Sequence, residues 1–309
     1  MTPRSGLDRA PLRALAEVAA EEPALVGIGT TLAVPESARA IAVAGLACAG
    51  DRTPLLVAVP TTADAEHLAG DLEQYLGDEV ELFPAWETLP FERVSPSVET
   101  MGRRLRTMWR LRTGERTLVV APVRALVQRL GPHVEDIEPI CVRPGAQLDP
   151  GVLVADLVAA GYRREYQVEA RGEVAVRGSI VDVYPSTADA PVRIDLWGDE
   201  VDRLTTFSVS DQRSRDDLED AEIFPCRELL VTDTVRARAE RLLSTEPWGR
   251  EQWERLAQGL VFDGMESWLP WVTPEERLLP DLLPDGALVL LVEPRRMRDR
   301  ARELLDEEA

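Results

Sequence analysis

The sequence predicts an α/β protein in which a parallel, doubly wound sheet is interrupted by a small inserted α+β domain. The parallel sheet is predicted because apolar strand-like segments alternate with helical segments through the first 130 residues, and one more apolar segment, 287–294, returns to that sheet later. The inserted domain is predicted from strands of alternating apolar and polar residues between these parts. With 309 residues, the chain is long enough for two domains, each with its own core.

The first part of the chain alternates strands with helices. Apolar residues at helical spacing predict helices, and short apolar runs predict buried strands. The predicted helices cover residues 7–20, 36–48, 62–76 and 123–130. The predicted strands cover residues 24–31, 55–60, 80–84 and 117–122. We therefore place the first part of the α/β domain at residues 1–139.

The turn after the first predicted strand lies where a phosphate-binding loop would be found. It carries Gly27, Gly29, Thr30 and Thr31 between a strand and a helix. A phosphate-binding loop of the Walker type also needs a lysine on the β- and γ-phosphates. The chain contains no lysine, because all 35 of its Lys and Arg residues are arginine. The turn is therefore interpreted as an ordinary strand–helix connection, and no cofactor is expected.

A basic helical segment precedes the last of these strands. Residues 91–130 hold nine arginines and three acidic residues. The apolar residues on one helical face are Met101, Leu105, Met108 and Trp109, and the arginines on the rest of the helix are Arg103, Arg104, Arg106 and Arg110. Such a face can contact a phosphate backbone. We favour a solvated face, or one paired with surrounding carboxylates.

The inserted domain is predicted at residues 140–211. Asp149 and Pro150 are suited to a helix start, and Gly161 to its end. A strand follows in which Arg177 points to the face opposite its apolar neighbours, until Gly178 breaks the alternation. Further strands are predicted at 192–197 and 204–209, joined by a turn.

The remainder, residues 212–309, is predicted to be the second, mostly helical part of the α/β domain. Strands are expected at 223–226 and 287–294, and helices at 234–244, 248–259 and the charged C-terminus. Trp268 and Trp271 are interpreted as core or interface aromatic residues.

Composition excludes several classes of function. The formal net charge is −20, so the chain as a whole repels nucleic acids and anionic membranes. No run approaches the roughly 18 apolar residues of a membrane-spanning helix, and the N-terminus has no signal-peptide layout. Three widely spaced cysteines, Cys48, Cys141 and Cys226, fit a reduced, cytoplasmic protein.

Metal binding and hydrolytic catalysis are not expected either. The only histidines are His67 and His133, too few for a histidine-rich metal site or a catalytic triad. Four carboxylates near one turn do not have the spacing of a calcium-binding loop. They are Asp195, Asp199, Glu200 and Asp202.

Several segments, taken together and in order, resemble the N-terminal module of bacterial transcription-repair coupling factors (Mfd). They are WETLPFE (86–92) with SP (95–96), GYRREYQV and GEVAVRGSIVDVYP within 161–185, RIDLWGDEVDRL (193–204), DQRS (211–214) and FDGMESWLP (262–270). That module is similar to the first half of UvrB, in which an inserted domain that binds UvrA splits a RecA-like sheet. The resemblance implies a degenerate RecA-like, helicase-type parallel sheet with helices on both faces.

The resemblance also implies which residues would bind UvrA. The family uses arginines and an aromatic residue of the inserted domain, and the matching residues are Arg163, Arg177 and Tyr184, with Arg164 as a further candidate. Tyr184 stands where relatives often have Phe. Two departures from UvrB imply a segment that neither hydrolyses ATP nor probes damaged DNA. The Walker lysine is missing, and the connection over residues 86–103 is too short for the long β-hairpin of UvrB.

The resulting hypothesis is a non-catalytic recruitment module that mimics UvrB, binds UvrA and brings nucleotide excision repair to a stalled RNA polymerase. The family implies a longer parent protein, in which later domains bind RNA polymerase and translocate on DNA with ATP, and a C-terminal domain masks the UvrA-binding surface. The alternative is a nucleotide-dependent DNA helicase or DNA-binding domain. The missing lysine argues against the helicase, and the net charge argues against DNA binding.

Overall fold

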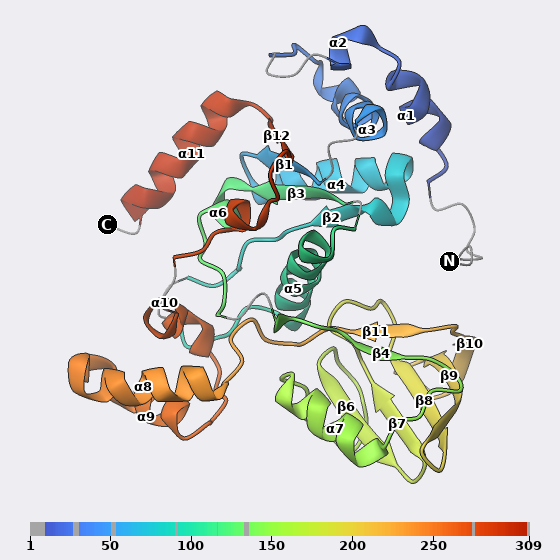
Figure 1. Cartoon of the computed structure of the whole chain (residues 1–309), viewed down its shortest axis with the longest axis vertical. Coiled ribbons are helices and arrows are strands. Elements are labelled where there is room, and N and C mark those ends of the chain that lie inside the picture. The colour runs from blue at the N-terminus through green and yellow to red at the C-terminus, as the bar shows by residue number, and fades with distance from the viewer. Residues whose placement is uncertain are drawn as a thin grey trace. The chain divides into compact units, whose positions relative to one another are not determined.

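The computed structural model describes residues 10–26, 31–50, 54–89, 92–115, 117–132, 136–273 and 276–307. Its chain forms two compact units, each assembled from separate stretches of sequence (Figure 1). The first unit comprises Met1–Ala85, Arg110–Gln128 and Leu278–Ala309. The second comprises Trp86–Trp109 and Arg129–Arg277. The predicted domain boundaries at residues 139/140 and 211/212 stay predictions.

The first unit is built on a four-stranded parallel sheet in the order β12-β1-β3-β2. The strands are β1 (Leu55–Val59), β2 (Val80–Leu82), β3 (Leu118–Pro122) and β12 (Leu288–Leu291). β12 pairs with β1, which confirms that the segment at 287–294 returns to the first sheet. The central strands β1 and β3 are buried along their whole length, as expected for parallel strands that are covered on both faces.

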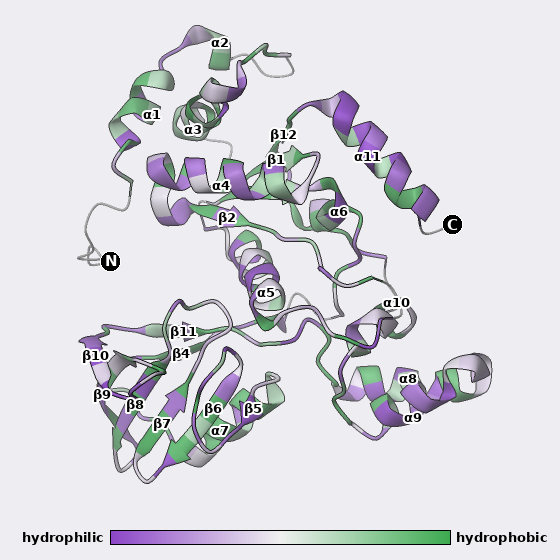
Figure 2. Ribbon diagram, turned by 180° about the vertical axis from the view of Figure 1, so that it is seen from behind, coloured by the Kyte–Doolittle hydropathy of each residue, from purple (hydrophilic) through white to green (hydrophobic). Residues whose placement is uncertain are grey.

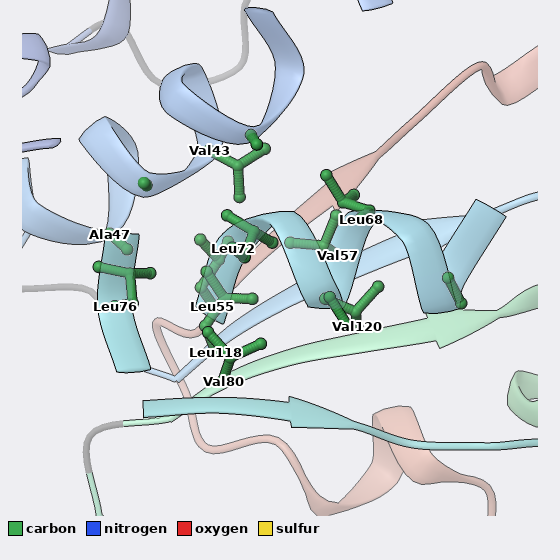
Figure 3. Packing of buried hydrophobic residues seen from close by; sticks show 14 of the residues in the cluster. Val43, Ala47, Leu55, Val57, Leu68, Leu72, Leu76, Val80, Leu118 and Val120 are labelled. Atoms are coloured by element: carbon green, nitrogen blue, oxygen red, sulfur yellow. The ribbon is translucent and has the colours of Figure 1, made fainter. Parts of the chain in front are cut away.

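Helices of this unit pack on the parallel sheet or on one another. They are α1 (Arg13–Ala19), α2 (Pro23–Val26), α3 (Arg39–Ala49), α4 (Thr62–Leu76), α6 (Val123–Leu126) and α11 (Pro294–Glu307). Val43 of α3 and Leu72 of α4 share one buried cluster with Val57 and Val120 of the sheet (Figure 3). α6 contacts both β1 and β3. α11 is hydrophilic along most of its length, and its buried residue is Leu304 (Figure 2). The predicted α/β class is thereby confirmed.

One predicted strand of this unit is wrong in its first half. Residues 24–26, predicted to be extended, lie in the short helix α2. Pro23 at its first position has a backbone angle that suits a helix start, and a short apolar run alone does not distinguish a strand from a helix. Gly27, Gly29 and Thr30 lie outside the described residues, and Thr31 is exposed.

The second unit contains a six-stranded sheet in the order β10-β9-β8-β7-β6-β5, antiparallel except for the β5–β6 pair. The strands are β5 (Arg163–Arg164), β6 (Glu173–Arg177), β7 (Ile180–Val183), β8 (Val192–Trp197), β9 (Glu200–Phe207) and β10 (Ser214–Asp217). Two further strands, β4 (Ile140–Val142) and β11 (Ala221–Ile223), pair antiparallel with each other. The chain therefore enters and leaves this sheet region along two neighbouring strands. The prediction of a small inserted α+β part is confirmed.

The helix α7 (Pro150–Ala159) packs on this sheet (Figure 1). The side chain of Asp149 accepts hydrogen bonds from the backbone N–H groups of Gly151 at 2.7 Å and Val152 at 2.9 Å, which confirms the predicted helix start. Gly161 follows the helix with φ +94°, a left-handed conformation that favours glycine.

The rest of the second unit is helical. Its helices are α8 (Asp233–Thr245), α9 (Arg250–Ala257) and α10 (Leu269–Val272). Four tryptophans pack together here, with ring centroids 5.1–6.4 Å apart. They are Trp248, Trp253, Trp268 and Trp271, so the interpretation of the last two as core aromatic residues is confirmed. None of the described helices is long and apolar enough to cross a bilayer.

The basic helix α5 (Val98–Thr113) buries the apolar face that its spacing predicts. Met101, Leu105 and Met108 are 1–2% exposed. Gly102 lies in the same helix against Ser186, and an added Cβ would lie 2.4 Å from the Oγ of Ser186 and 2.5 Å from its Cβ. The glycine therefore permits a close approach that no other residue allows.

We expect Gly102→Ala to lower the free energy of unfolding by about 1–3 kcal/mol, because overpacking outweighs the better helix propensity of alanine. Gly70 in α4 is the matched control, since it is exposed and an added Cβ there meets nothing within 4 Å. Gly70→Ala should raise the free energy of unfolding by about 0.5–1 kcal/mol. Urea unfolding followed by circular dichroism measures both. A stabilising effect of both substitutions would contradict the close approach of Ser186.

Candidate protein-binding site

The six-stranded sheet has two different faces, because successive residues of a strand point to opposite sides. On one face, Val174, Val181 and Ile194 join Leu153 and Leu157 of α7 in a buried cluster. The opposite face, here called the outer face, is covered by no helix within the described residues. The side chains on it are Glu173, Ala175, Arg177, Ile180, Asp182, Tyr184, Arg193, Asp195, Trp197, Arg203, Thr205 and Phe207.

Three charged residues are linked across the outer face from β6 to β8. Asp182, at 1% exposure, accepts two hydrogen bonds from Arg193, from Nε at 2.7 Å and from Nη2 at 2.9 Å. Arg177 donates a further hydrogen bond to the same carboxylate. The hydrogen bond to Asp182 raises the pKa of Arg193 above its usual value. Asp182 therefore accepts hydrogen bonds from two arginines, and Arg193 supplies the bidentate pair.

Arg177 and Arg193 differ in exposure. The side chain of Arg177 is 37% exposed, whereas that of Arg193 is 11% exposed. The guanidinium of Arg193 also lies 4.7 Å from the ring centroid of Phe207, and its Nη1 donates to the backbone oxygen of Gln212 at 3.0 Å. Arg193 is therefore held within the protein, and Arg177 lies at its surface.

Gln212 supports this arrangement from the turn before β10. Its backbone has φ +57°, which is uncommon for a residue other than glycine. Its side-chain amide donates to the backbone oxygens of Val168 at 3.2 Å and Val209 at 3.0 Å. Its side-chain oxygen accepts from Arg177 at 3.5 Å. The DQRS segment thus holds the arginines of the outer face in place.

Tyr184 and Arg163 also lie on the outer face, on the two sides of Glu173 at the start of β6. The Tyr184 ring packs with Val168, Ala175 and Phe207, and its hydroxyl donates to the backbone oxygen of Asp189 at 3.0 Å. Arg163 is paired with Glu173 at 3.3 Å, and its side chain remains 70% exposed.

The structure brings three of the four predicted residues to one face. Arg163 is in register with Glu173, and Arg177 ends the same strand, so the two arginines are about 13 Å apart along the strand direction. Arg164 is in register with Val174, which points towards α7. Arg164 is exposed on that opposite side of the sheet edge.

Sequence reasoning missed Asp182, Arg193 and Gln212. Signals for all three were present. Asp182 is a single charge within the apolar run IVDV, and Arg193 alternates with apolar residues that point inward. Gln212 lies in a segment that carried the family resemblance without an assigned role.

The arginines of α5 are largely paired. Arg103 binds Glu99 at 2.8 Å, and Arg110 binds Glu81 at 2.7 Å. Arg104 is fully buried against Glu228 at 2.7 Å. These contacts agree with the interpretation of a helix face paired with carboxylates, and they weaken the DNA-binding alternative.

The buried thiol of Cys226 is not suited to act as a nucleophile. All three cysteines are free thiols, and Cys226 is buried in the cluster beneath α7. Burial raises the pKa of the Cys226 thiol to about 12. A thiol of this kind is inert at neutral pH, because the thiolate is the nucleophile.

Comparison with known proteins identifies the family that this part of the chain resembles. Residues 140–229 match the family described as UvrB interaction domain. The chain is 40% identical to the transcription-repair-coupling factor of Mycobacterium bovis over 293 residues, which is 89% of this chain and 24% of that protein. It is 31% identical to the factor of Bacillus subtilis over 88% of this chain and 25% of the relative, and 28% identical to that of Escherichia coli over 70% and 19%. The chain therefore spans about a fifth to a quarter of the length of these curated relatives.

Proposed function

Because the chain is a homologue of part of the transcription-repair-coupling factors and carries a UvrB interaction domain, we propose that it is a recruitment module that binds UvrA through the outer face. The observation that supports this most strongly is that Arg163, Arg177 and Tyr184 share one face of a single sheet. No described helix covers that face. Arg163 and Arg177 are paired with neighbouring carboxylates, and their side chains remain 70% and 37% exposed.

The chemistry of the face suits a protein partner. Arginine forms planar, charge-assisted hydrogen bonds with carboxylates, and arginine and aromatic residues are enriched at interfaces. The network beneath Arg177 restricts its side chain before binding, which lowers the entropic cost of association. The proposed mechanism is mimicry of UvrB, by which a longer parent protein recruits nucleotide excision repair to a stalled RNA polymerase.

The segment itself is proposed to be non-catalytic. No lysine is present to bind the β- and γ-phosphates of a nucleotide. Addition of ATP with Mg²⁺ should therefore leave the thermal unfolding midpoint unchanged. Binding of RNA polymerase, translocation on DNA and masking of the outer face are proposed to belong to other domains of the parent protein.

Calorimetric titration of UvrA with this protein tests the proposal. We expect the wild type to bind and Arg163→Ala to weaken binding by about 5- to 30-fold, because an interface arginine loses its charge-assisted bonds. Arg143 is a matched control, with a side chain 69% exposed against 70% for Arg163 and a single carboxylate partner, Asp220. Arg143→Ala should bind within twofold of wild type.

Three outcomes would contradict the proposal. A wild-type protein that is folded and does not bind UvrA removes the function. Equal loss of affinity in both variants would mean that net charge, and not the outer face, attracts UvrA. A shift in unfolding temperature with ATP would revive the helicase alternative.

A further inference from the structure

Trp197 differs from every other tryptophan of the chain. Its side chain lies at the end of β8 and is 83% exposed. Each of the other six tryptophans makes an indole hydrogen bond or a contact with another ring. Within the described residues, Trp197 makes neither. A large aromatic side chain left in water at this level is characteristic of interaction sites.

The backbone beneath Trp197 is well ordered by hydrogen bonds. Trp197 pairs with Glu200 across a tight turn that begins with Gly198 at φ +63°. The backbone N–H of Leu148 donates to the oxygen of Asp199 at 2.5 Å, and that of Val201 donates to the oxygen of Ala146 at 2.9 Å. The hairpin is thus held from the segment before α7. A hairpin backbone that is already held in place loses little further conformational entropy when a partner covers its side chain.

Trp197 also lies close to the proposed UvrA contact. The backbone N–H of Leu196 donates to the oxygen of Ser179 at 2.9 Å, which puts the end of β8 beside the turn after Arg177. The side chains of Arg177 and Trp197 both point to the outer face. Trp197 lies two strands away from Arg177 and two residues further along the strand direction, which gives a separation of about 12 Å. A standard interface buries about 800 Å² on each partner, a patch nearly 30 Å across. One partner can therefore cover Arg177 and Trp197 together.

We propose that Trp197 is the aromatic anchor of the UvrA interface, buried in a pocket of UvrA while Arg177 forms the neighbouring polar contact. This inference rests on the proposed function and extends its site by one residue that family resemblance does not supply. Tryptophan and arginine are enriched among the residues that contribute most to the binding energy of protein interfaces, and such residues cluster near the centre of the interface. Tyr184 is half-buried against its own domain and has less surface to give.

The first test is a calorimetric titration of UvrA with Trp197→Ala. We expect a loss of affinity of at least about 30-fold, as for a hot-spot tryptophan. Val152→Ala is the control, since Val152 is a large apolar residue of the same domain, 58% exposed, on α7 at the other face of the sheet. It should bind within twofold of wild type. Circular dichroism melting checks that both variants are folded.

The second test needs no variant. Trypsin cleaves after arginine, and cleavage after Arg193 and Arg203 releases the peptide 194–203, which contains Trp197 as its one aromatic residue. Hydroxyl-radical footprinting should oxidise this peptide readily in the free protein. UvrA should reduce its oxidation at least about fivefold, because a covered indole is shielded from the radical.

The outcomes separate this inference from the proposed function. Failure of the wild type to bind UvrA removes both. A different pattern would overturn only the role of Trp197 as an anchor. In that pattern the wild type binds UvrA, Arg177→Ala binds weakly, Trp197→Ala binds almost normally and the peptide 194–203 is not protected. The proposed recruitment function would then still hold. Equal losses in Trp197→Ala and Val152→Ala would also overturn the role of Trp197 as an anchor.

Discussion

Replacing Glu228 by alanine should lower the free energy of unfolding of the second unit by about 3–5 kcal/mol, the largest stability effect that we expect in this protein. The side chains of Glu228 and Arg104 are both 0% exposed and are joined by two hydrogen bonds, at 2.7 and 3.1 Å. The indole of Trp86 donates to the same carboxylate at 2.9 Å, and the backbone N–H of Gly131 donates to it at 3.4 Å. The substitution leaves a buried guanidinium without its carboxylate.

Urea unfolding followed by tryptophan fluorescence measures this effect selectively, because all seven tryptophans lie in the second unit. Arg104→Ala should lower the free energy of unfolding by a similar amount, because it leaves a buried carboxylate without its guanidinium partner. The double variant Arg104→Met with Glu228→Met should recover part of the loss, since a buried apolar pair often replaces an ion pair without cost. Recovery should be incomplete, as Trp86 and Gly131 lose their acceptor.

The control for this pair is an exposed ion pair of the same unit. Arg250 binds Glu254 at 3.0 Å, with side-chain exposures of 71% and 48%. Arg250→Ala should change the free energy of unfolding by less than about 0.5 kcal/mol. Equal effects at Arg104 and Arg250 would show that burial of the Arg104 pair does not govern its contribution.

Replacing Arg177 by alanine should weaken UvrA binding by about 30- to several-thousand-fold, the range for a charged interface contact worth 2–5 kcal/mol. The fold should survive, because Asp182 keeps both hydrogen bonds from Arg193. Arg177→Lys should recover only part of the affinity, since lysine keeps the charge and loses the planar fork. Titration calorimetry with UvrA measures the affinity, and urea unfolding measures the fold.

Arg193→Ala is the matched comparison for Arg177→Ala. It removes a guanidinium from the same carboxylate, but from a site that is 11% exposed, so its main effect should be on stability. We expect a loss of about 1–3 kcal/mol from the free energy of unfolding, because Asp182 then keeps only the half-exposed Arg177. If Arg177→Ala destabilises the protein as much as Arg193→Ala and leaves UvrA binding unchanged, Arg177 is a structural residue and not a contact.

Local signals predicted much of the fold correctly. α4 begins and ends where its periodicity places it, because Thr61 caps the helix by accepting from the N–H of Asp64 and Gly77 ends it with φ +59°. The return of β12 to the parallel sheet also followed from one apolar run. By contrast, the run at 24–31 fits a strand or a helix equally well, and its first part is helical.

Contacts between residues far apart in the sequence could not be predicted from the sequence alone. Arg103, Arg104 and Arg106 read alike in the sequence, yet Arg104 alone of the three is fully buried, because Glu228 lies 124 residues away in the chain and against it in space. The pairing of Arg177 with Asp182 could have been predicted, because the two residues are five positions apart in the sequence, on either side of a turn. The exposure of Trp197 could not be predicted from the sequence, because it depends on which face of the sheet α7 covers.

The pairing of β4 with β11 explains how the segment between them can be inserted into a host protein, in evolution or by design. Two paired strands lie about 5 Å apart, so the stretch between them starts and finishes at nearly the same point in space. A polypeptide with adjoining ends can be spliced into a surface loop of an unrelated host at little cost in loop-closure entropy. For the same reason, residues 140–223 are suited to insertion into another protein as one segment that carries its whole recognition surface.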